Sequence, residues 1–433
     1  MNLSLTIMLF PILIVGQKNT STHLANYMQA QVEVNNFSGT VLVTKNGSVL
    51  LKKAYGLADY EWNIKNTVDT KFQLASVTKQ FTATAILQLV EKGKLSLNDR
   101  LSKFFPDYPK GDSITIHMLL SHSSGLALGF KELALSTISS DSAYSEIKKI
   151  PFEFSPGTNS GYSNIGYYLL AKIIEKVSGE QYAVFLRKNI FEKVGMKNTG
   201  VSNNDSIIAK KAKIYCQSEN GLIHNPYINW GFNIGHDGVY STVEDLALWD
   251  KALYGTTILS TEMKKQMFTS HNDQNWGYGF IINPFYNHGH QLIAHDGGFF
   301  GTMTSFNRFT DDNIFVTVLS NNESFSYIIG YGLSAIALQK EVELPYKHIQ
   351  TNIDTMIYDN YVGKYGEIEI VKIDGKLYFN SLEMELLPES QTRFFRADNN
   401  DRTIEFIQDE SGNFNALILT KGGVKEVIKR TIE

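Results

Sequence analysis

The chain contains a serine and a lysine three residues apart, in the run Ser76-Val-Thr-Lys79. Residues at positions i and i+3 share one face of a helix, so a helix over this run presents both side chains together. Where a helix begins at Ser76, the backbone N–H of that serine has no intrahelical partner and can donate to an oxyanion. A lysine whose pKa is lowered by burial or by a nearby cation can activate the hydroxyl. The pattern is consistent with acyl transfer through a covalent serine intermediate.

The same spacing also has a simpler interpretation. A serine at a helix start is often the N-cap, with the lysine in solvent, and spacing alone favours this interpretation. A second copy of the pattern, Ser145-Glu-Ile-Lys148, has the same spacing. Only the copy at Ser76 opens a long run of helical periodicity, over residues 76–93, which makes it the better candidate.

A tyrosine and an asparagine form a second pattern, Tyr162-Ser-Asn164, at a predicted junction between a loop and a helix. A tyrosine that loses its proton near a cation can act as a general base, and an asparagine can orient a lysine or a substrate. The triplet recurs elsewhere, for example at Tyr227-Ile-Asn229. Spacing alone again favours a structural interpretation, in which Tyr162 packs beneath a helix N-terminus.

A third pattern is His295-Asp296-Gly297-Gly298. Where a histidine at a strand end is followed by glycines, the backbone there has no side chains in the way. A substrate can then lie along the strand edge and pair with it like an additional strand. His236-Asp237-Gly238 repeats the tripeptide. We prefer the copy at 295, because β-rich segments flank it and the copy at 236 leads into a predicted helix cap. For either copy the alternative is a glycine turn with an aspartate cap.

The sequence gives little support for a metal site. Three histidines, His288, His290 and His295, are close in sequence, and three histidines can hold zinc. They lack a helical His-x-x-x-His spacing and a partnered acidic base, so we expect no metal. The single cysteine, Cys216, excludes an internal disulfide framework and a zinc site made of several cysteines.

The elements that position these motifs follow a simple order. A hairpin is predicted over residues 38–55 around the turn pair Asn46-Gly47, and strands return over residues 277–320 before a helix over 325–340. Between them, residues 96–270 are largely helical, and Ser241-Thr-Val-Glu244 has the pattern of a capping box. If the early and late strands share one sheet, they bracket the helical insert, and a cleft is expected between the two lobes.

The segment after Pro345 has a different pattern of residues. Residues 356–433 contain short alternating strands separated by turn pairs, which predicts a separate small β-barrel or β-sandwich. We therefore expect an α/β (α+β) fold: an antiparallel sheet flanked by helices with a mainly helical subdomain, over residues 24–342, and an all-β domain over residues 355–433.

Composition and charge narrow the function. Hydrophobic residues make up 43% of the 433-residue chain and charged residues 19%, as in folded globular proteins. The formal net charge of -4 provides no basic field for nucleic acid. Residues 3–15 are apolar but too short to span a bilayer, so residues 1–16 are predicted to be a signal peptide of an exported protein. No basic residue precedes the apolar run, and the alternative is a buried N-terminal strand.

Taken together and in order, these patterns resemble the serine β-lactamase and penicillin-binding-protein superfamily. The likeness is closest to the class C branch of β-lactamase-related serine hydrolases, which includes DD-carboxypeptidases, D-aminopeptidases and esterases. It covers about residues 25–340, and the tail is similar to the lipocalin-like β-barrel often appended to such enzymes. The runs that carry it are Phe72-Gln-Leu-Ala-Ser-Val-Thr-Lys-Gln-Phe81, Met118-Leu-Leu-Ser-His-Ser-Ser-Gly-Leu126, Phe154-Ser-Pro-Gly-Thr158, Tyr162-Ser-Asn-Ile-Gly-Tyr-Tyr-Leu-Leu170 and Gly238-Val-Tyr-Ser-Thr-Val-Glu-Asp-Leu246.

The resemblance implies roles for the motif residues. Ser76 would be the acylated nucleophile, Lys79 would take or relay its proton, and Tyr162 would be the base for acylation and the acid for the leaving group. Asn164 would position the lysine and the substrate. The remaining implied roles are substrate binding by His295 and Gly297 and an oxyanion hole formed by the amides of Ser76 and Gly298. No metal or organic cofactor is implied.

One departure from the family bears on the substrate. β-Lactamases commonly carry Lys-Thr-Gly where this chain has His-Asp-Gly. If Asp296 faces the cleft it penalises an anionic substrate tail, whereas on the other face of the strand it does not. The expected activity is hydrolysis of ester, amide or peptide bonds in a small molecule or peptide. Weak β-lactamase activity would be one example of such hydrolysis. The alternative is a module that binds penicillin or peptidoglycan fragments with little or no turnover. The sequence leaves the oligomeric state open.

Overall fold

The computed structural model describes residues 10–129, 135–137, 140–380, 384–397 and 399–431. The chain forms two compact units. The larger unit is Phe37–Gly330, and the described residues before and after it form the smaller unit. Each unit is described separately below.

A six-stranded antiparallel sheet forms the centre of the larger unit. Its early strand pairs with its last strand in sequence, from Gly39 opposite Ser320 to Lys45 opposite Ile314. The predicted early and late β segments therefore share one sheet, as expected. The strands in spatial order are β10 (Ile281–Ile282), β11 (Leu292–Phe299), β12 (Thr302–Phe309), β13 (Ile314–Ser320), β1 (Gly39–Lys45) and β2 (Ser48–Tyr55).

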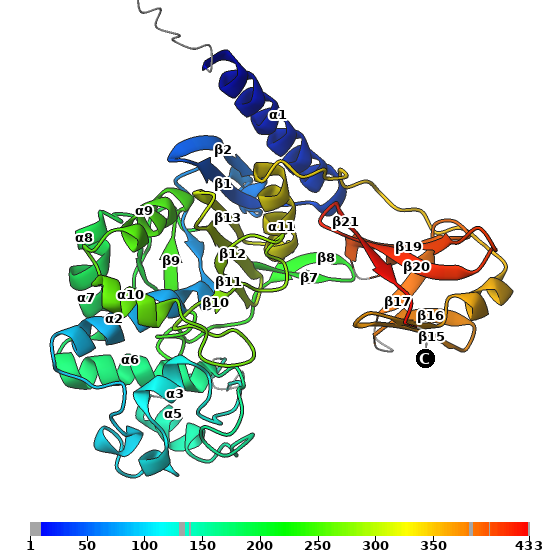
Figure 1. Ribbon diagram of the computed structural model, residues 1–433. Coiled ribbons are helices and arrows are strands. Elements are labelled where there is room, and N and C mark those ends of the chain that lie inside the picture. Colours follow the sequence, from blue (N-terminus) through cyan, green and yellow to red (C-terminus); the bar gives the residue numbers. More distant parts are fainter. Residues whose placement is uncertain (1–9, 130–134, 138–139, 381–383, 398, 432–433) are drawn as a thin grey trace, which may run out of the picture. The chain divides into compact units, whose positions relative to one another are not determined.

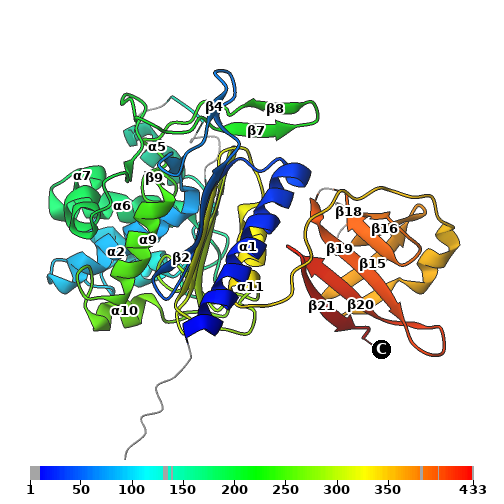
Figure 2. The ribbon, with the colours of Figure 1, turned by 90° about the horizontal axis from the view of Figure 1, so that it is seen from above.

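Helices cover one face of this sheet. Figure 2 shows α2 (Thr78–Glu91), α6 (Asn164–Ser178) and α9 (Val243–Tyr254) along that face. Helix α2 lies at the centre and its residues from Thr78 to Leu89 are buried, because neighbouring helices pack around it. The other described helices of this region are α3 (Ile116–Leu120), α5 (Ser140–Ile147), α7 (Tyr182–Leu186), α8 (Glu192–Val194) and α10 (Thr261–Met267), with a π turn between α7 and α8.

The predicted helical insert also contains short strands. Strand β9 (Val239–Ser241) lies between β5 (Phe72–Gln73) and β6 (Gly200–Val201). The other short pairs are β3 (Leu57–Asp59) with β4 (Ile64–Lys65) and β7 (Tyr215–Ser218) with β8 (Gly221–His224). The predicted capping box at Ser241 is wrong, because Ser241 lies on β9. Thr242 caps α9 instead, and its side chain accepts from the backbone N–H of Asp245 at 3.2 Å.

The smaller unit contains an eight-stranded antiparallel sheet in which each strand pairs with the next along the chain. A bridge between Tyr365 and Arg430 joins the first strand to the end of the last, so the sheet closes into a barrel. The predicted separate all-β domain is confirmed (Figure 1). Its strands are β14 (Gly363–Tyr365), β15 (Ile368–Ile373), β16 (Lys376–Phe379), β17 (Glu385–Pro388), β18 (Arg393–Arg396), β19 (Asn399–Gln408), β20 (Phe414–Lys421) and β21 (Val424–Lys429).

The remaining helices of the described residues are α1 (Phe10–Asn35), α11 (Ser326–Ala337) and 3-10 helices that include Leu101–Lys103, Gly111–Ser113 and Thr355–Asn360. Gln31 and Asn35 of α1 each donate to the Asp401 carboxylate of the barrel at 2.8 Å. Of the predicted signal peptide, residues 1–9 lie outside the described residues and residues 10–16 lie in α1. None of the described helices is long and apolar enough to cross a membrane.

Candidate active site

Ser76 lies on a sharp turn between a strand and a helix. The chain leaves β5, turns through Ala75 with a φ of 47°, and continues through a 3-10 turn (Ala75–Val77) into α2. A positive φ is uncommon for a residue other than glycine and often marks a functional turn. Helix α2 is capped at Val77 without a side-chain hydrogen bond. The N-cap interpretation of Ser76 is therefore wrong, and the hydroxyl is left for other partners.

Lys79 lies one helical turn further along α2 and is fully buried. Its Nζ donates to Ser76 Oγ at 3.1 Å, to Asn164 Oδ1 at 2.7 Å and to the His236 carbonyl oxygen at 3.2 Å. Burial lowers the pKa of Lys79 to about 8, although the charge of Asp237 acts in the opposite direction. The structure thus brings the predicted serine, lysine and asparagine into direct contact.

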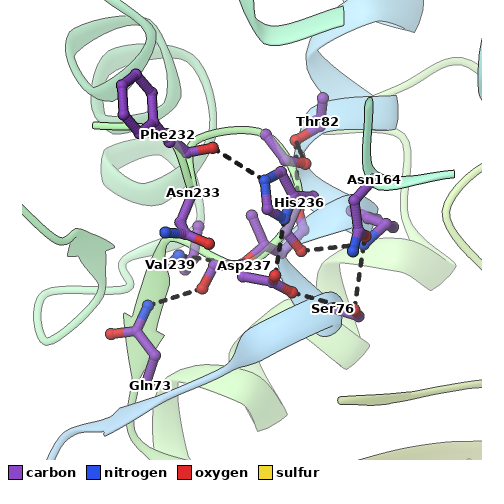
Figure 3. Close-up of polar contacts among 12 residues, drawn as sticks. Gln73, Ser76, Thr82, Asn164, Phe232, Asn233, His236, Asp237 and Val239 are labelled. Carbon is purple, nitrogen blue, oxygen red and sulfur yellow. Dashed lines mark hydrogen bonds and ion pairs between the residues drawn. The ribbon is translucent and has the colours of Figure 1, made fainter. Parts of the chain in front are cut away.

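A histidine and an aspartate that the sequence analysis did not select also contact the nucleophile. Ser76 Oγ donates to Asp237 Oδ1 at 3.1 Å, and Asp237 Oδ2 lies 2.7 Å from His236 Nδ1 (Figure 3). His236 Nε2 lies 3.0 Å from the Phe232 carbonyl oxygen. Burial would raise the pKa of Asp237, but His236, Lys79 and the hydrogen bond from Ser76 keep it below its ordinary value.

The sequence favours the His295 copy over the His236 copy because the latter leads into a helix cap. The segment after His236 does reach the cap of α9 at Thr242, but first forms β9, which pairs with β5 directly before the nucleophile turn. The sequence did contain a signal for this. Gly238 begins the run Gly238-Val-Tyr-Ser-Thr, which is one of the segments that carry the family resemblance.

Tyr162 lines the cleft and lies two residues before the first residue of α6. Ser163 caps that helix by accepting from the Gly166 N–H at 3.1 Å, so Tyr162 is free of the capping role. The Tyr162 ring lies 4.8 Å from Lys79 Nζ and 4.5 Å from the His122 ring. Burial and then the charge of Asp237 raise the pKa of Tyr162 well above its ordinary value, although contact with Ser76 opposes them. The side chain is therefore a neutral phenol at neutral pH.

His295 lies on β11, with its ring 6.2 Å from that of Tyr162 and 5.8 Å from that of Trp276. Its Nδ1 lies 2.6 Å from the Asp296 carbonyl oxygen, which only accepts, so the proton is on Nδ1. Burial, followed by the charge of Lys79, lowers the pKa of His295 to about 3. The imidazole is neutral at neutral pH, so this position supplies no cation to the site.

Asp296 faces away from the site. Directly opposite residues of an antiparallel pair share a face, and His295 is opposite Phe306, whose side chain is part of the core beneath the helices. Asp296 is opposite Ser305, which lies against Gly330 of α11. The Tyr286 hydroxyl donates to Asp296 at 3.0 Å. The argument that Asp296 repels an anionic substrate therefore lapses.

The two glycines after Asp296 have different surroundings. A Cβ on Gly297 would lie 2.4 Å from the Leu74 carbonyl oxygen and 2.3 Å from Thr304 Oγ1. Glycine at this position therefore lets β11 run close beside the nucleophile turn. Gly298 lines the cleft, whereas Gly297 is not among its lining residues. The roles predicted for the Ser76 and Gly298 amides as oxyanion donors stay predictions.

The cleft has a volume of about 730 Å³. Among its described lining residues there are three acids, Glu153, Asp237 and Glu323, and no lysine or arginine. Its remaining lining residues are Ser76, Ala127, Leu128, Gly129, Tyr162, Asn164, Asn233, His236, Gly298, Phe299, Phe300, Thr302 and Met303. Lys79 and His295 lie behind this surface. The lining therefore favours neutral or cationic groups over anionic ones.

Over the part of the chain that the structure describes, no group of three His, Cys, Asp or Glu residues is arranged to hold a metal ion. His290 of the histidine cluster contacts Asp312 at 2.8 Å, and His295 is buried beside Tyr162.

Comparison with known proteins agrees with this geometry. The beta-lactamase family pattern matches residues 24–331 of the chain. The chain belongs to the beta-lactamase family. A penicillin-binding protein of Bacillus subtilis is 29% identical over 455 aligned residues, which cover 95% of this chain and 99% of that protein. The octameric penicillin-binding protein homologue of Pyrococcus abyssi is 28% identical, with a TM-score of 0.68 over 94% of this chain and 99% of that one.

A D-amino acid amidase of Ochrobactrum anthropi shares the fold at 23% identity, with a TM-score of 0.64 over 75% of this chain and 97% of that one. The family and fold neighbours are thus serine hydrolases, among them penicillin-binding proteins and amidases. The expected family and fold are confirmed. One relative forms an octamer, and the oligomeric state of this chain stays open.

The buried neutral imidazole of His295 predicts a loss of stability in acid. Its folded pKa of about 3 lies below the ordinary value of 6.5, so between these values the unfolded chain binds more protons and stability falls with falling pH. Between pH 7 and pH 5 this contributes a loss of about 2 kcal/mol. Between pH 7 and pH 5, the unfolding free energy of His295→Gln should fall by about 2 kcal/mol less than that of the wild type, as measured by urea unfolding. His224→Gln, at an exposed histidine, is the control. An equal fall in unfolding free energy in the wild type and both variants would contradict a buried, neutral His295.

Proposed function

We propose that the protein is a hydrolase of esters or amides that forms an acyl-enzyme on Ser76. The observation that carries the proposal is the position of Ser76 Oγ, which lines the cleft and lies 3.1 Å from both Lys79 Nζ and Asp237 Oδ1. A hydroxyl held between a cation and a carboxylate has an acceptor for its proton and a positive charge to stabilise developing negative charge. A protein that only binds ligands has no need of this arrangement.

The neighbouring groups fit the roles that the family suggests. Asn164 accepts from Lys79 at 2.7 Å and so fixes the ammonium beside Ser76. The amides of Ser76 and Gly298 belong to residues that line the cleft and are proposed to hold the oxyanion. Tyr162, as a neutral phenol, is proposed to give its proton to the leaving group.

Replacing the nucleophile tests the proposal. Ser76→Ala should lower turnover of p-nitrophenyl acetate by about a thousandfold or more, because it removes the group that is acylated. Ser145→Ala is the matched control, since it alters the second serine–lysine pattern. Intact mass should show one acyl adduct on the wild type and on Ser145→Ala after brief exposure to the ester, and none on Ser76→Ala. Benzylpenicillin, which carries a carboxylate, is run in parallel as the second reagent.

Three outcomes are informative. Chromophore release without an adduct means fast deacylation, and the rate of Ser76→Ala then decides. Wild-type rates in Ser76→Ala on every substrate would exclude the acyl-enzyme. Binding of the two reagents with neither adduct nor turnover would favour a penicillin-binding or peptidoglycan-binding module instead.

We further propose that the acyl donor is neutral or carries an amine. Support comes from the three acids of the cleft lining and from His295, which is neutral where β-lactamases commonly carry a lysine. Away from Ser76, a substrate carboxylate would meet acids of the lining and no lysine or arginine, since Lys79 lies behind the nucleophile. Each unpaired charge that loses water costs free energy. The fold shared with a D-amino acid amidase makes D-amino acid amides suitable probes.

A matched pair of substrates tests this charge preference. We expect kcat/KM for D-alanine p-nitroanilide to exceed that for its N-succinyl derivative by more than tenfold, because the first carries an ammonium on its amino side and the second a carboxylate. The gap should narrow in 0.5 M salt, since screening weakens charge interactions at an open cleft. Equal values, or a preference for the succinyl compound, would contradict the proposed substrate class.

Export remains a proposal, supported by the apolar run at residues 3–15 and by the small residue Gly16 after it. Expression in a bacterial host with intact-mass measurement of the extracytoplasmic fraction tests it. The expected product lacks about the first 16 residues. A full-length product confined to the cytoplasm would contradict export.

A further inference from the structure

The buried pair His236 and Asp237 has no role in the chemistry implied by the family resemblance, although it contacts the nucleophile. Its contacts form one continuous hydrogen-bonded line from the Phe232 carbonyl oxygen through His236 and Asp237 to Ser76 (Figure 3). From Ser76 the line continues through Lys79 to Asn164. Since His236 and Asp237 are 3% and 2% exposed, their protons are shared with these partners rather than with solvent.

The partners of Lys79 fix its protonation state. The His236 carbonyl oxygen and Asn164 Oδ1 can only accept hydrogen bonds, and Ser76 Oγ uses its own proton toward Asp237. All three contacts of Nζ therefore need a proton from the lysine, and only an ammonium has three. In this resting arrangement Lys79 is already protonated and has no lone pair with which to take the serine proton.

The proton of Ser76 points instead at Asp237. An ionised carboxylate only accepts, and Oδ1 is the oxygen that the serine hydroxyl contacts. The other oxygen, Oδ2, shares one proton with His236 Nδ1 across 2.7 Å. His236 Nε2 lies 3.0 Å from the Phe232 carbonyl oxygen, so the ring has a partner at both nitrogens.

The backbone holds the pair firmly. Gln73 Nε2 donates to the Asp237 carbonyl oxygen at 2.7 Å, and the Asp237 N–H donates to the Asn233 carbonyl oxygen at 3.1 Å. A Cβ on Gly238 would lie 2.9 Å from that same Asn233 oxygen, so this close turn requires glycine. A carboxylate fixed in this way meets the serine without paying for reorganisation during the reaction.

We infer that Asp237, held by His236, is a catalytic residue that accepts the hydroxyl proton of Ser76 when the serine attacks its substrate; this rests on the proposed function of Ser76. In the attack a bond forms from Oγ to the carbonyl carbon, the O–H bond breaks, and the proton passes to Asp237 Oδ1. The carbonyl π pair moves to its oxygen, and Lys79 remains an ammonium beside the reacting atoms.

Collapse of the tetrahedral intermediate completes acylation. The carbonyl re-forms, and the bond from its carbon to the leaving nitrogen or oxygen breaks with its electron pair on the leaving atom. That atom takes a proton from the Tyr162 phenol. Asp237 then gives up the serine proton and Tyr162 regains one through solvent in the cleft that both side chains line, so both groups return to their starting states. The product has gained one proton and Ser76 has lost one.

The chain offers a matched control, because the same tripeptide occurs at His295 with its aspartate on the opposite face of the sheet. Acylation by p-nitrophenyl acetate is followed in the full-length chain by stopped flow between pH 6 and pH 10, with intact mass to confirm the adduct on Ser76. We expect Asp237→Asn to lower the plateau acylation rate by about a hundredfold or more, as for loss of a general base. Asp296→Asn should remain within about twofold of the wild type.

The pH profile distinguishes this role from an effect on the lysine alone. If Lys79 is the base and Asp237 only supplies negative charge, Asp237→Asn lowers the pKa of Lys79, moves the acid limb to lower pH and keeps the plateau within about threefold. That result would overturn the inference. His122, His295 and Tyr162 face the same cluster and are unchanged in the variants compared.

A second variant covers the case in which Asp237→Asn does not fold, judged by circular dichroism. His236→Gln keeps the carboxylate and removes its imidazole partner, so acylation should slow by about tenfold, with KM for the ester nearly unchanged. A wild-type rate in His236→Gln would exclude the pair. Failure of the proposed function would be seen in a different variant. If Ser76→Ala turned over at the wild-type rate, Ser76 would not be the nucleophile, whatever the result for Asp237→Asn.

Discussion

The Lys79 ammonium is buried, and its charge is balanced by three oxygen acceptors and by the faces of the Tyr162 and Tyr167 rings. An isolated charge in a protein interior costs several kcal/mol, so these acceptors must be held in place for the helix to bury the lysine. They come from the 3-10 turn before α2, from the start of α6 and from the segment before β9. The packing of three segments that are distant in sequence therefore depends on one buried cation.

The sheet and the small strands bring these segments together. Pairing of β5 with β9 sets the residues before Ser76 beside those after Asp237. Strand β11 runs against the same turn, and Thr304 on the neighbouring strand donates to the Leu74 carbonyl oxygen at 2.9 Å. Gly297 makes this approach possible, because any side chain there would overlap the turn. The shape of the site is thus a consequence of close backbone packing around Ala75, which has a positive φ.

The electrostatic character of the cleft follows from burial as much as from charge. His295 is neutral because it is buried near an ammonium, and Tyr162 keeps its proton because it is buried near a carboxylate. The site therefore presents a cation and a carboxylate at the nucleophile and acids at the rim. This distribution supports the proposed preference for neutral or amine-bearing substrates, in a fold that is shared with penicillin-binding proteins.

The fold class and the separate all-β tail were predictable from the amino-acid sequence, because periodicity and turn residues are local properties of the chain. The family, and with it the role of Ser76 beside Lys79, followed from the likeness of several ordered motifs, since i,i+3 spacing alone favoured an N-cap serine. Which of the two His-Asp-Gly copies presents its aspartate to the serine depends on the three-dimensional packing. The two tripeptides are identical, and the difference arises because alternate residues of β11 face opposite sides of the sheet, whereas the turn before β9 directs Asp237 at Ser76. Strand pairing between distant segments, and the burial that sets each charge, cannot be read from spacing.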